Sequence, residues 1–183
     1  SLPASSSRRD VTLSPSVSPP TEVERQCAKH APPSLDKSLR SSLCFGVASH
    51  AIREPGRCAY SALRSGSGSL PAEDAVLLCQ GAESKAPADC ARSASSRLLS
   101  TNERASLCRK STSSTQPSKC ADKILRWHVS GAAAAALCSG ATSQAPSSCF
   151  ERIWKKRSHF GKSLLDKPDR AAELCTEKRR NKN

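Results

Sequence analysis

The chain carries the stretch Leu78-Cys79-Gln80-Gly81-Ala82-Glu83-Ser84-Lys85-Ala86-Pro87-Ala88-Asp89-Cys90, and its pattern returns as Leu137-Cys138-Ser139-Gly140-Ala141-Thr142-Ser143-Gln144-Ala145-Pro146-Ser147-Ser148-Cys149. Both stretches read L-C-x-G-A-x-S-x-A-P-x-x-C, with the same residue at every fixed position. An internal repeat of this kind indicates an array of similar structural units. We therefore treat this pattern as the feature that decides the fold.

The ten cysteines fall into two alternating classes, which extend the pattern over most of the chain. Members of one class follow a proline by three residues, except that Glu24 takes the place of that proline before the first of them. Members of the other class directly follow a leucine. The first class is Cys27, Cys58, Cys90, Cys120 and Cys149; the second is Cys44, Cys79, Cys108, Cys138 and Cys175. This alternation defines five units of about thirty residues.

Each unit is predicted to form two short antiparallel helices. Proline is favoured in the first turn of a helix, where its missing N–H would have no partner. Glycine stands two residues after three of the Leu-Cys cysteines, at Gly46, Gly81 and Gly140, where a helix end favours a left-handed residue. No stretch shows the sustained alternation of a strand. The predicted fold class is therefore all-α, with five helical-hairpin repeats in an α-solenoid-like array.

The predicted domain organisation has three parts. An extended tail rich in serine and proline covers residues 1–22, the repeat array covers 23–177, and a basic tail covers 178–183. We expect units at about 23–46, 55–81, 87–109, 117–140 and 146–177.

The composition limits what kind of protein this is. The apolar fraction is 37% and aromatic residues make up only 3%, so alanine, leucine and cysteine must supply the packing. A core of small side chains buries little apolar area against the entropy of the chain, and we expect disulfides or a partner to add stability. The net charge of +13 favours a polyanionic partner, although a solvated basic surface is an alternative. No apolar run is long enough for a transmembrane helix.

The cysteines have three competing interpretations. The preferred one is a disulfide inside each hairpin, because the two cysteines of an antiparallel helix pair lie side by side at its open end. The pairs would then be Cys27–Cys44, Cys58–Cys79, Cys90–Cys108, Cys120–Cys138 and Cys149–Cys175. A second arrangement pairs cysteines across the linkers between units and leaves the first and last unpaired. In the third, all ten are reduced and serve as small core residues.

No catalytic, cofactor or metal site is predicted. The chain has no glycine-rich phosphate loop, no nucleophile elbow and no paired histidines around a glutamate. It has no C-x-x-C pair, and its four histidines hold no common place in the repeat, which argues against zinc. We therefore expect neither enzymatic activity nor a cofactor.

The strongest local signal for binding is a basic and aromatic segment in unit five, with a smaller counterpart in unit four. Lysine and arginine neutralise phosphates, and an exposed aromatic ring can stack on a base. The predicted contacts with RNA or an acidic partner are Arg126, Trp127, Trp154, Lys155, Lys156, Arg157, Lys162, Arg179 and Arg180. The alternative is that the apolar residues of this segment cap the end of the array and the charges are simply solvated.

Two functional hypotheses follow from these features. The first is a non-catalytic structural subunit of a large assembly, such as a mitochondrial ribosome or another ribonucleoprotein. Such a subunit would contact RNA and neighbouring proteins. Residues 1–20 resemble the end of an organellar transit region in composition, although secreted linkers have a similar composition. The second is a secreted or lumenal module, stapled by disulfides, that binds proteins or anionic glycans. Association with a cytoskeletal polymer of acidic surface is a further alternative.

Overall fold

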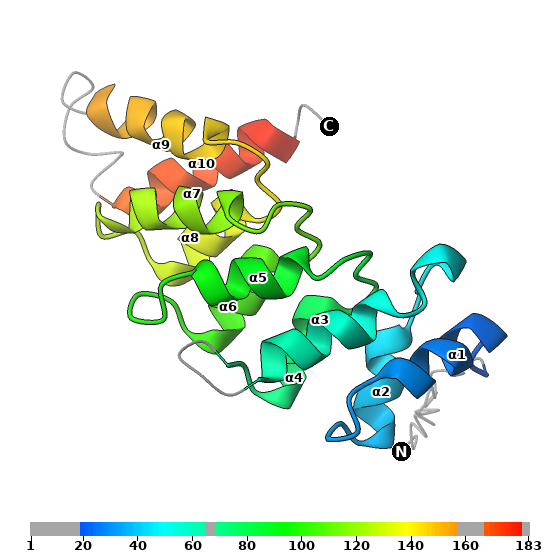
Figure 1. Ribbon diagram of the computed structural model, residues 1–183. Coiled ribbons are helices and arrows are strands. Elements are labelled where there is room, and N and C mark those ends of the chain that lie inside the picture. The colour runs from blue at the N-terminus through cyan, green and yellow to red at the C-terminus, as the bar shows by residue number, and fades with distance from the viewer. Residues whose placement is uncertain (1–18, 65–68, 157–166, 181–183) are drawn as a thin grey trace, which may run out of the picture.

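The computed structural model describes residues 19–64, 69–156 and 167–180, and these residues are all-α. Five helical hairpins follow one another along an elongated array, with the first and fifth hairpins at opposite ends (Figure 1). The first four are α1 (Glu22–His30) with α2 (Lys37–Cys44), α3 (Glu54–Leu63) with α4 (Ala72–Cys79), α5 (Ala86–Ser93) with α6 (Thr101–Cys108), and α7 (Gln116–Leu125) with α8 (Gly131–Cys138). The fifth is α9 (Ala145–Lys156) with α10 (Pro168–Arg180), and a 3-10 helix, Ser49–Ala51, precedes α3. The predicted fold class is confirmed.

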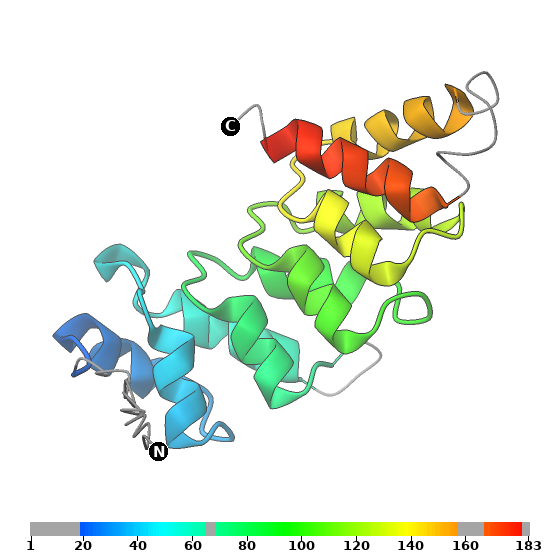
Figure 2. The same cartoon turned by 180° about the vertical axis from the view of Figure 1, so that it is seen from behind.

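The helices form two layers. The odd-numbered helices pack on one another along one layer and the even-numbered helices along the other, as Figures 1 and 2 show from opposite sides. Because every hairpin runs in the same sense, the turns within hairpins gather on one long edge of the array. The connections between hairpins gather on the opposite edge. We call these the hairpin-loop edge and the inter-unit edge.

A disulfide joins the two helices of every hairpin. The bonds are Cys27–Cys44, Cys58–Cys79, Cys90–Cys108, Cys120–Cys138 and Cys149–Cys175, with Cα–Cα distances of 5.6 to 6.0 Å. These distances lie within the range that a disulfide requires. The structure therefore has the arrangement within hairpins, and no cysteine is free. Around these bonds the core consists mainly of alanine and leucine side chains.

The residues of the repeated pattern have specific structural roles on the inter-unit edge. The helices α2, α4, α6 and α8 all end at the cysteine of the Leu-Cys pair. The chain then passes through a left-handed residue and turns back into the next hairpin. The serine of the pattern starts that hairpin: the Ser84 hydroxyl accepts the N–H of Ala86 at 3.2 Å, and the Ser143 hydroxyl accepts the N–H of Ala145 at 3.3 Å.

Glu24, which replaces the repeat proline in unit one, ties this unit to the following turn. Its carboxylate accepts the N–H of Thr21 at 2.8 Å and the N–H of Gly46 at 3.1 Å. Thr21 in turn accepts the N–H of Glu24, which completes a capping box at the start of α1. The N–H groups of Gly46 and Thr21 lower the pKa of Glu24, because they stabilise its charged form.

The small residue two places before each first-class cysteine sets how closely neighbouring hairpins approach. An ideal Cβ on Gly56 of α3 would lie 2.2 Å from the carbonyl oxygen of His30 in α1. The Ser118 hydroxyl of α7 contacts the Ser93 hydroxyl of α5 at 2.8 Å. The corresponding residues of α5 and α9, Ala88 and Ser147, are buried as well. In α1 this place is taken by the exposed Arg25, so unit one has a polar outer face and caps the array.

Lys110 occupies the place of the repeat glycine in the turn after α6, and its left-handed backbone is strained there. It has φ of 57°, close to the 64° of Gly81 and the 62° of Gly140 in the matching places. A left-handed backbone is unfavourable for a residue with a Cβ by about 1–2 kcal/mol. Lys110→Gly is therefore expected to raise the free energy of unfolding by about 1 kcal/mol, as measured by chemical denaturation.

The control for this prediction is the reverse change in an equivalent turn. No atom lies within 4 Å of an ideal Cβ on Gly81, so Gly81→Ala should lower stability through backbone strain alone. Equal effects of the two substitutions, in sign and size, would contradict this explanation.

The two predicted domain boundaries lie after residue 22 and after residue 177. Most of the predicted N-terminal tail, residues 1–18, lies outside the described residues, and α1 begins at Glu22. At the other end, the predicted boundary at 178 falls inside α10, which continues to Arg180. In the described residues no helix is long and apolar enough to cross a membrane.

Candidate functional site

The predicted contact residues divide between the two edges of the array. Arg126 and Trp127 lie in the turn between α7 and α8, and Lys155 and Lys156 end α9, so these four belong to the hairpin-loop edge of units four and five. Trp127 is 39% exposed. On the same edge, burial raises the pKa of Asp122, while the charge of Arg126 opposes this shift.

Trp154 has a different environment from Trp127. It is only 8% exposed, and its ring stacks on Phe150 with the ring centroids 5.9 Å apart. A base would have to displace this packing to stack on Trp154, so the hairpin-loop edge offers Trp127 as its exposed tryptophan. Arg157 and Lys162 lie outside the described residues, and Arg180 is the last residue of α10.

Arg179 lies on the inter-unit edge and anchors α10 to the end of α8. Its guanidinium donates to the carbonyl oxygens of Ser139 at 2.9 Å, Gly140 at 3.3 Å and Leu137 at 3.4 Å. These carbonyls end a helix and carry its partial negative charge, which favours a cation. Arg179 therefore has a structural role that its position near the basic tail did not indicate.

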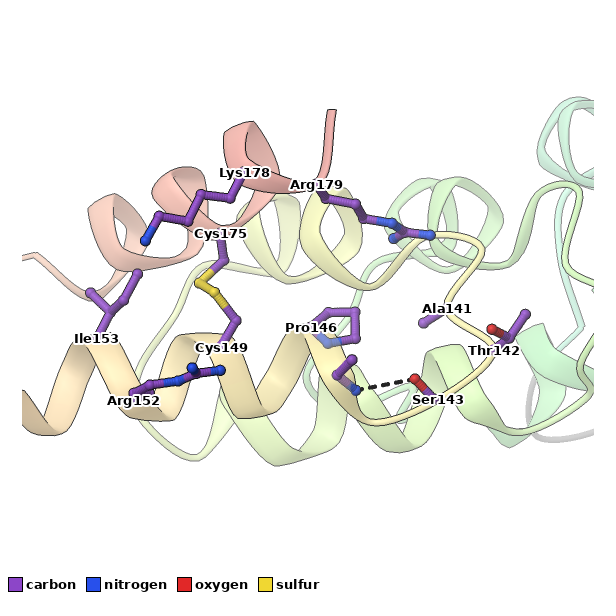
Figure 3. Close-up of a pocket in the computed structure, with 11 residues that line it drawn as sticks. Ala141, Thr142, Ser143, Pro146, Cys149, Arg152, Ile153, Cys175, Lys178 and Arg179 are labelled. Atoms are coloured by element: carbon purple, nitrogen blue, oxygen red, sulfur yellow. Dashed lines mark hydrogen bonds between the residues drawn. A yellow bond between two sulfur atoms is a disulfide. The ribbon is translucent and has the colours of Figure 1, made fainter. Parts of the chain in front are cut away.

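A groove lies beside Arg179, between α9, α10 and the turn that enters α9. Its volume is about 840 Å³, and the Cys149–Cys175 disulfide lies on its floor (Figure 3). The apolar part of the lining comes from Ala141, Ala145, Pro146 and Ile153. Arg152 of α9 and Lys178 of α10 stand on either side of the disulfide, so an apolar floor is flanked by two cations. We call this the C-terminal groove.

The groove is open because α10 does not end at its cysteine. In units one to four, the residue three places after the Leu-Cys cysteine folds back, and its N–H bonds to the carbonyl of that cysteine, as from Ala82 to Cys79 at 3.0 Å. These residues are all buried: Val47, Ala82, Ser111 and Ala141. The corresponding residue of unit five is Lys178, which remains in the helix and is exposed.

A stripe along α9 is consequently less covered than its counterparts. Pro146, Cys149 and Ile153 are each partly exposed. The corresponding residues of units two to four are all buried: Pro55, Cys58 and Ala62; Pro87, Cys90 and Ala94; Pro117, Cys120 and Ile124. The sequence repeats this stripe, so its exposure follows from the continuation of α10 and from the lack of a further unit beside α9 within the described residues.

Exposure makes the Cys149–Cys175 bond the most accessible of the five disulfides. Eight of the other cysteines are 0% exposed, whereas Cys149 is partly exposed. Since thiol–disulfide exchange requires access to a sulfur atom, limiting reductant should open this bond at least about tenfold faster than the others. Alkylation followed by peptide mass mapping would measure the order. Simultaneous reduction of all five bonds would contradict the prediction.

A second hollow of about 560 Å³ lies further along the inter-unit edge, between the turns that follow α2, α4 and α6. It is crossed by a hydrogen bond of 2.7 Å from the Arg109 guanidinium to the side-chain oxygen of Gln80. Phe45 stands in its lining and is largely exposed. This hollow is therefore bridged by a hydrogen bond between two of its own side chains, and we consider the C-terminal groove the better candidate site.

No group of histidine, cysteine, aspartate or glutamate side chains in the described residues could hold a metal ion. Comparison with family models gives no match, and searches of curated proteins and of solved structures likewise return no protein that matches. The class that the fold defines is therefore a helical-repeat array with one disulfide in each hairpin. Five disulfides in a chain of this size are typical of an oxidising compartment.

Proposed function

We propose that this protein is a non-catalytic binding module that works in an oxidising compartment, either secreted or lumenal, and attaches to a partner protein of acidic surface. The observation that carries the proposal is the disulfide inside every hairpin. Reducing compartments rarely retain such bonds, and an alanine-rich core gains most from them.

The charge of the chain supports an acidic partner. The net charge is +13, and the C-terminal groove has cations on both sides of an apolar floor. Complementary charge accelerates association and disfavours partners of like charge. The apolar floor of the groove would lose contact with water on binding, which favours the complex. Repeat arrays commonly bind through extended surfaces formed by successive units.

The redox state of the native protein tests this proposal. We expect alkylation of the protein, isolated from its own cellular source under conditions that block thiol exchange, to add no group before reduction. After reduction it should add ten, one for each cysteine. The intact mass gives both numbers. Addition of ten groups without reduction would contradict the proposed compartment.

A ribonucleoprotein subunit, as in a mitochondrial ribosome, is the second candidate. The observation in its favour is the hairpin-loop edge of units four and five, where Arg126, Lys155 and Lys156 accompany the exposed Trp127. Salt-dependent binding to RNA that is lost on Arg126→Glu and Trp127→Ala would favour this candidate. Unchanged binding in both variants would count against this edge as an RNA contact.

A further inference from the structure

We infer that the C-terminal groove and the exposed stripe of α9 bind an acidic helix of a partner protein, which lies on α9 as the next repeat would. This inference rests on the proposed function and names the surface and the occupant. The odd helices of the array already bind one another in this way.

In units two to four, two elements lie beside this stripe: the turn that folds back after the Leu-Cys cysteine, and the next odd helix. The buried counterparts of Pro146, Cys149 and Ile153 lie in helices that carry a further odd helix on their outer side: α3 is covered by α5, α5 by α7, and α7 by α9. The partly exposed stripe of α9 has the same or similar residue types at the matching places. A helix is therefore the element that fits it, with a small residue at the point of closest approach, as Ser118 and Ala88 provide within the array.

The residue three places after each first-class cysteine faces the next odd helix, so its partners indicate which charge the occupant of α9 should carry. In α3 and α5 this residue is Ser61 or Ser93, and it hydrogen-bonds to a side chain of the next odd helix, Arg92 or Ser118. In α7 it is Lys123, whose ammonium lies 3.2 Å from the carboxylate of Glu151 in α9.

The corresponding residue in α9 is Arg152, which is exposed and makes no ion pair within the described residues. By the same geometry, the helix that covers α9 would place a carboxylate against Arg152. Lys178 on the other side of the disulfide strengthens the preference for an acidic occupant.

A second copy of this chain is a poor occupant of the surface. Stacking of its unit one would place Arg25 where the array requires a small buried residue, and Arg25 would face Arg152. Pairing of two C-terminal units would bring together two sets of cations that include Arg152 and Lys178. Both arrangements bury like charges, which is unfavourable.

The probe for the test is a peptide derived from α9. This helix is chosen because it packs on the odd helix α7 within the array, as the occupant is expected to pack on α9. It copies residues 143–156 with Cys149→Ala, Arg152→Glu, Lys155→Glu and Lys156→Glu, and carries a fluorophore and blocked ends. The control peptide has only Cys149→Ala and stays basic. Binding to the full, oxidised chain is measured by fluorescence anisotropy, and the site is mapped by NMR chemical shifts.

We expect the acidic peptide to bind at least about ten times more tightly than the basic one, because charge complementarity decides between them. Shifts should concentrate on α9, α10 and the turn before α9. The double variant Arg152→Glu and Lys178→Glu should weaken binding at least about tenfold. The matched control, Lys29→Glu and Lys37→Glu, makes the same change of net charge with exposed residues of unit one and should alter binding less than about twofold.

Three results would overturn the inference: no binding of the acidic peptide, equal losses in the two double variants, or shifts confined to other units. A dimer in sedimentation that Arg152→Glu dissociates would also overturn it, since a second copy would then occupy the surface. These failures are distinct from failure of the proposed function, because all of them are measured on a protein whose disulfides have been shown to be formed.

Discussion

Replacing Cys90 and Cys108 together by alanine is expected to lower the free energy of unfolding by about 3 kcal/mol. The bond closes 18 residues at the centre of the array, and crosslinking a loop of this length restricts the unfolded chain by about that amount. For a chain of this size the midpoint of thermal unfolding should fall by about 6–12 °C, as measured by circular dichroism.

The control is the double replacement of Cys149 and Cys175 at the end of the array. Unit five packs on one neighbour within the described residues, whereas unit three packs on two. In a linear array, loss of an end unit affects one interface, and loss of a central unit affects two. Hydrogen exchange should therefore show loosening confined to α9 and α10 in the control. Equal loosening of units two to four in both variants would contradict this expectation.

Gly56→Ala is expected to lower the free energy of unfolding by about 2 kcal/mol. The new Cβ would lie 2.2 Å from the carbonyl oxygen of His30, a backbone atom held by the packing of α1 against α3. Alanine favours a helix over glycine by about 1 kcal/mol, but the overlap forces the two helices apart and outweighs this gain. Denaturation by urea would give the size of the loss.

Gly131→Ala is the matched control for this prediction. The atoms nearest to a Cβ at Gly131 belong to the carboxylate of Glu103, a side chain that can shift at the cost of its hydrogen bond from the N–H of Ser100. Gly131 is the first residue of α8, so the helix itself also tolerates alanine there. This variant should stay within about 1 kcal/mol of the original protein. A larger loss at Gly131 than at Gly56 would show that backbone overlap is not the cause.

The sequence predicts the hairpins well because their signals are local and repeated. Proline at a helix start in four units, glycine after a helix end in three, and a cysteine in every half-unit act within a few residues and reinforce one another. Pairing within hairpins also follows from one geometric step, since the two ends of a short antiparallel pair must meet. These features lead directly to the observed α1–α10 order.

The groove was not predictable in the same way, because it depends on where the array stops. Pro146, Cys149 and Ile153 match the pattern of the earlier units. They are partly exposed because α10 continues past its cysteine and because no further unit packs on α9 within the described residues. The continuation of α10 past Cys175 likewise depends on α8, whose last carbonyls accept the Arg179 guanidinium. Similarly, the burial of Trp154 against Phe150 follows from how α9 packs on its neighbours and not from the basic residues beside it.

All five crosslinks lie inside hairpins, and this has a mechanical consequence. If the two ends of the protein were pulled apart, only non-covalent packing would hold neighbouring hairpins together. Within each hairpin, the disulfide would keep the two helices joined. The hairpins should therefore separate from one another while each stays intact. The residues between the two cysteines of a hairpin cannot contribute to the extension, because the disulfide closes them in a loop. After release, refolding would require only that formed hairpins stack again. The array would then lengthen under load and recover its shape without breaking a covalent bond.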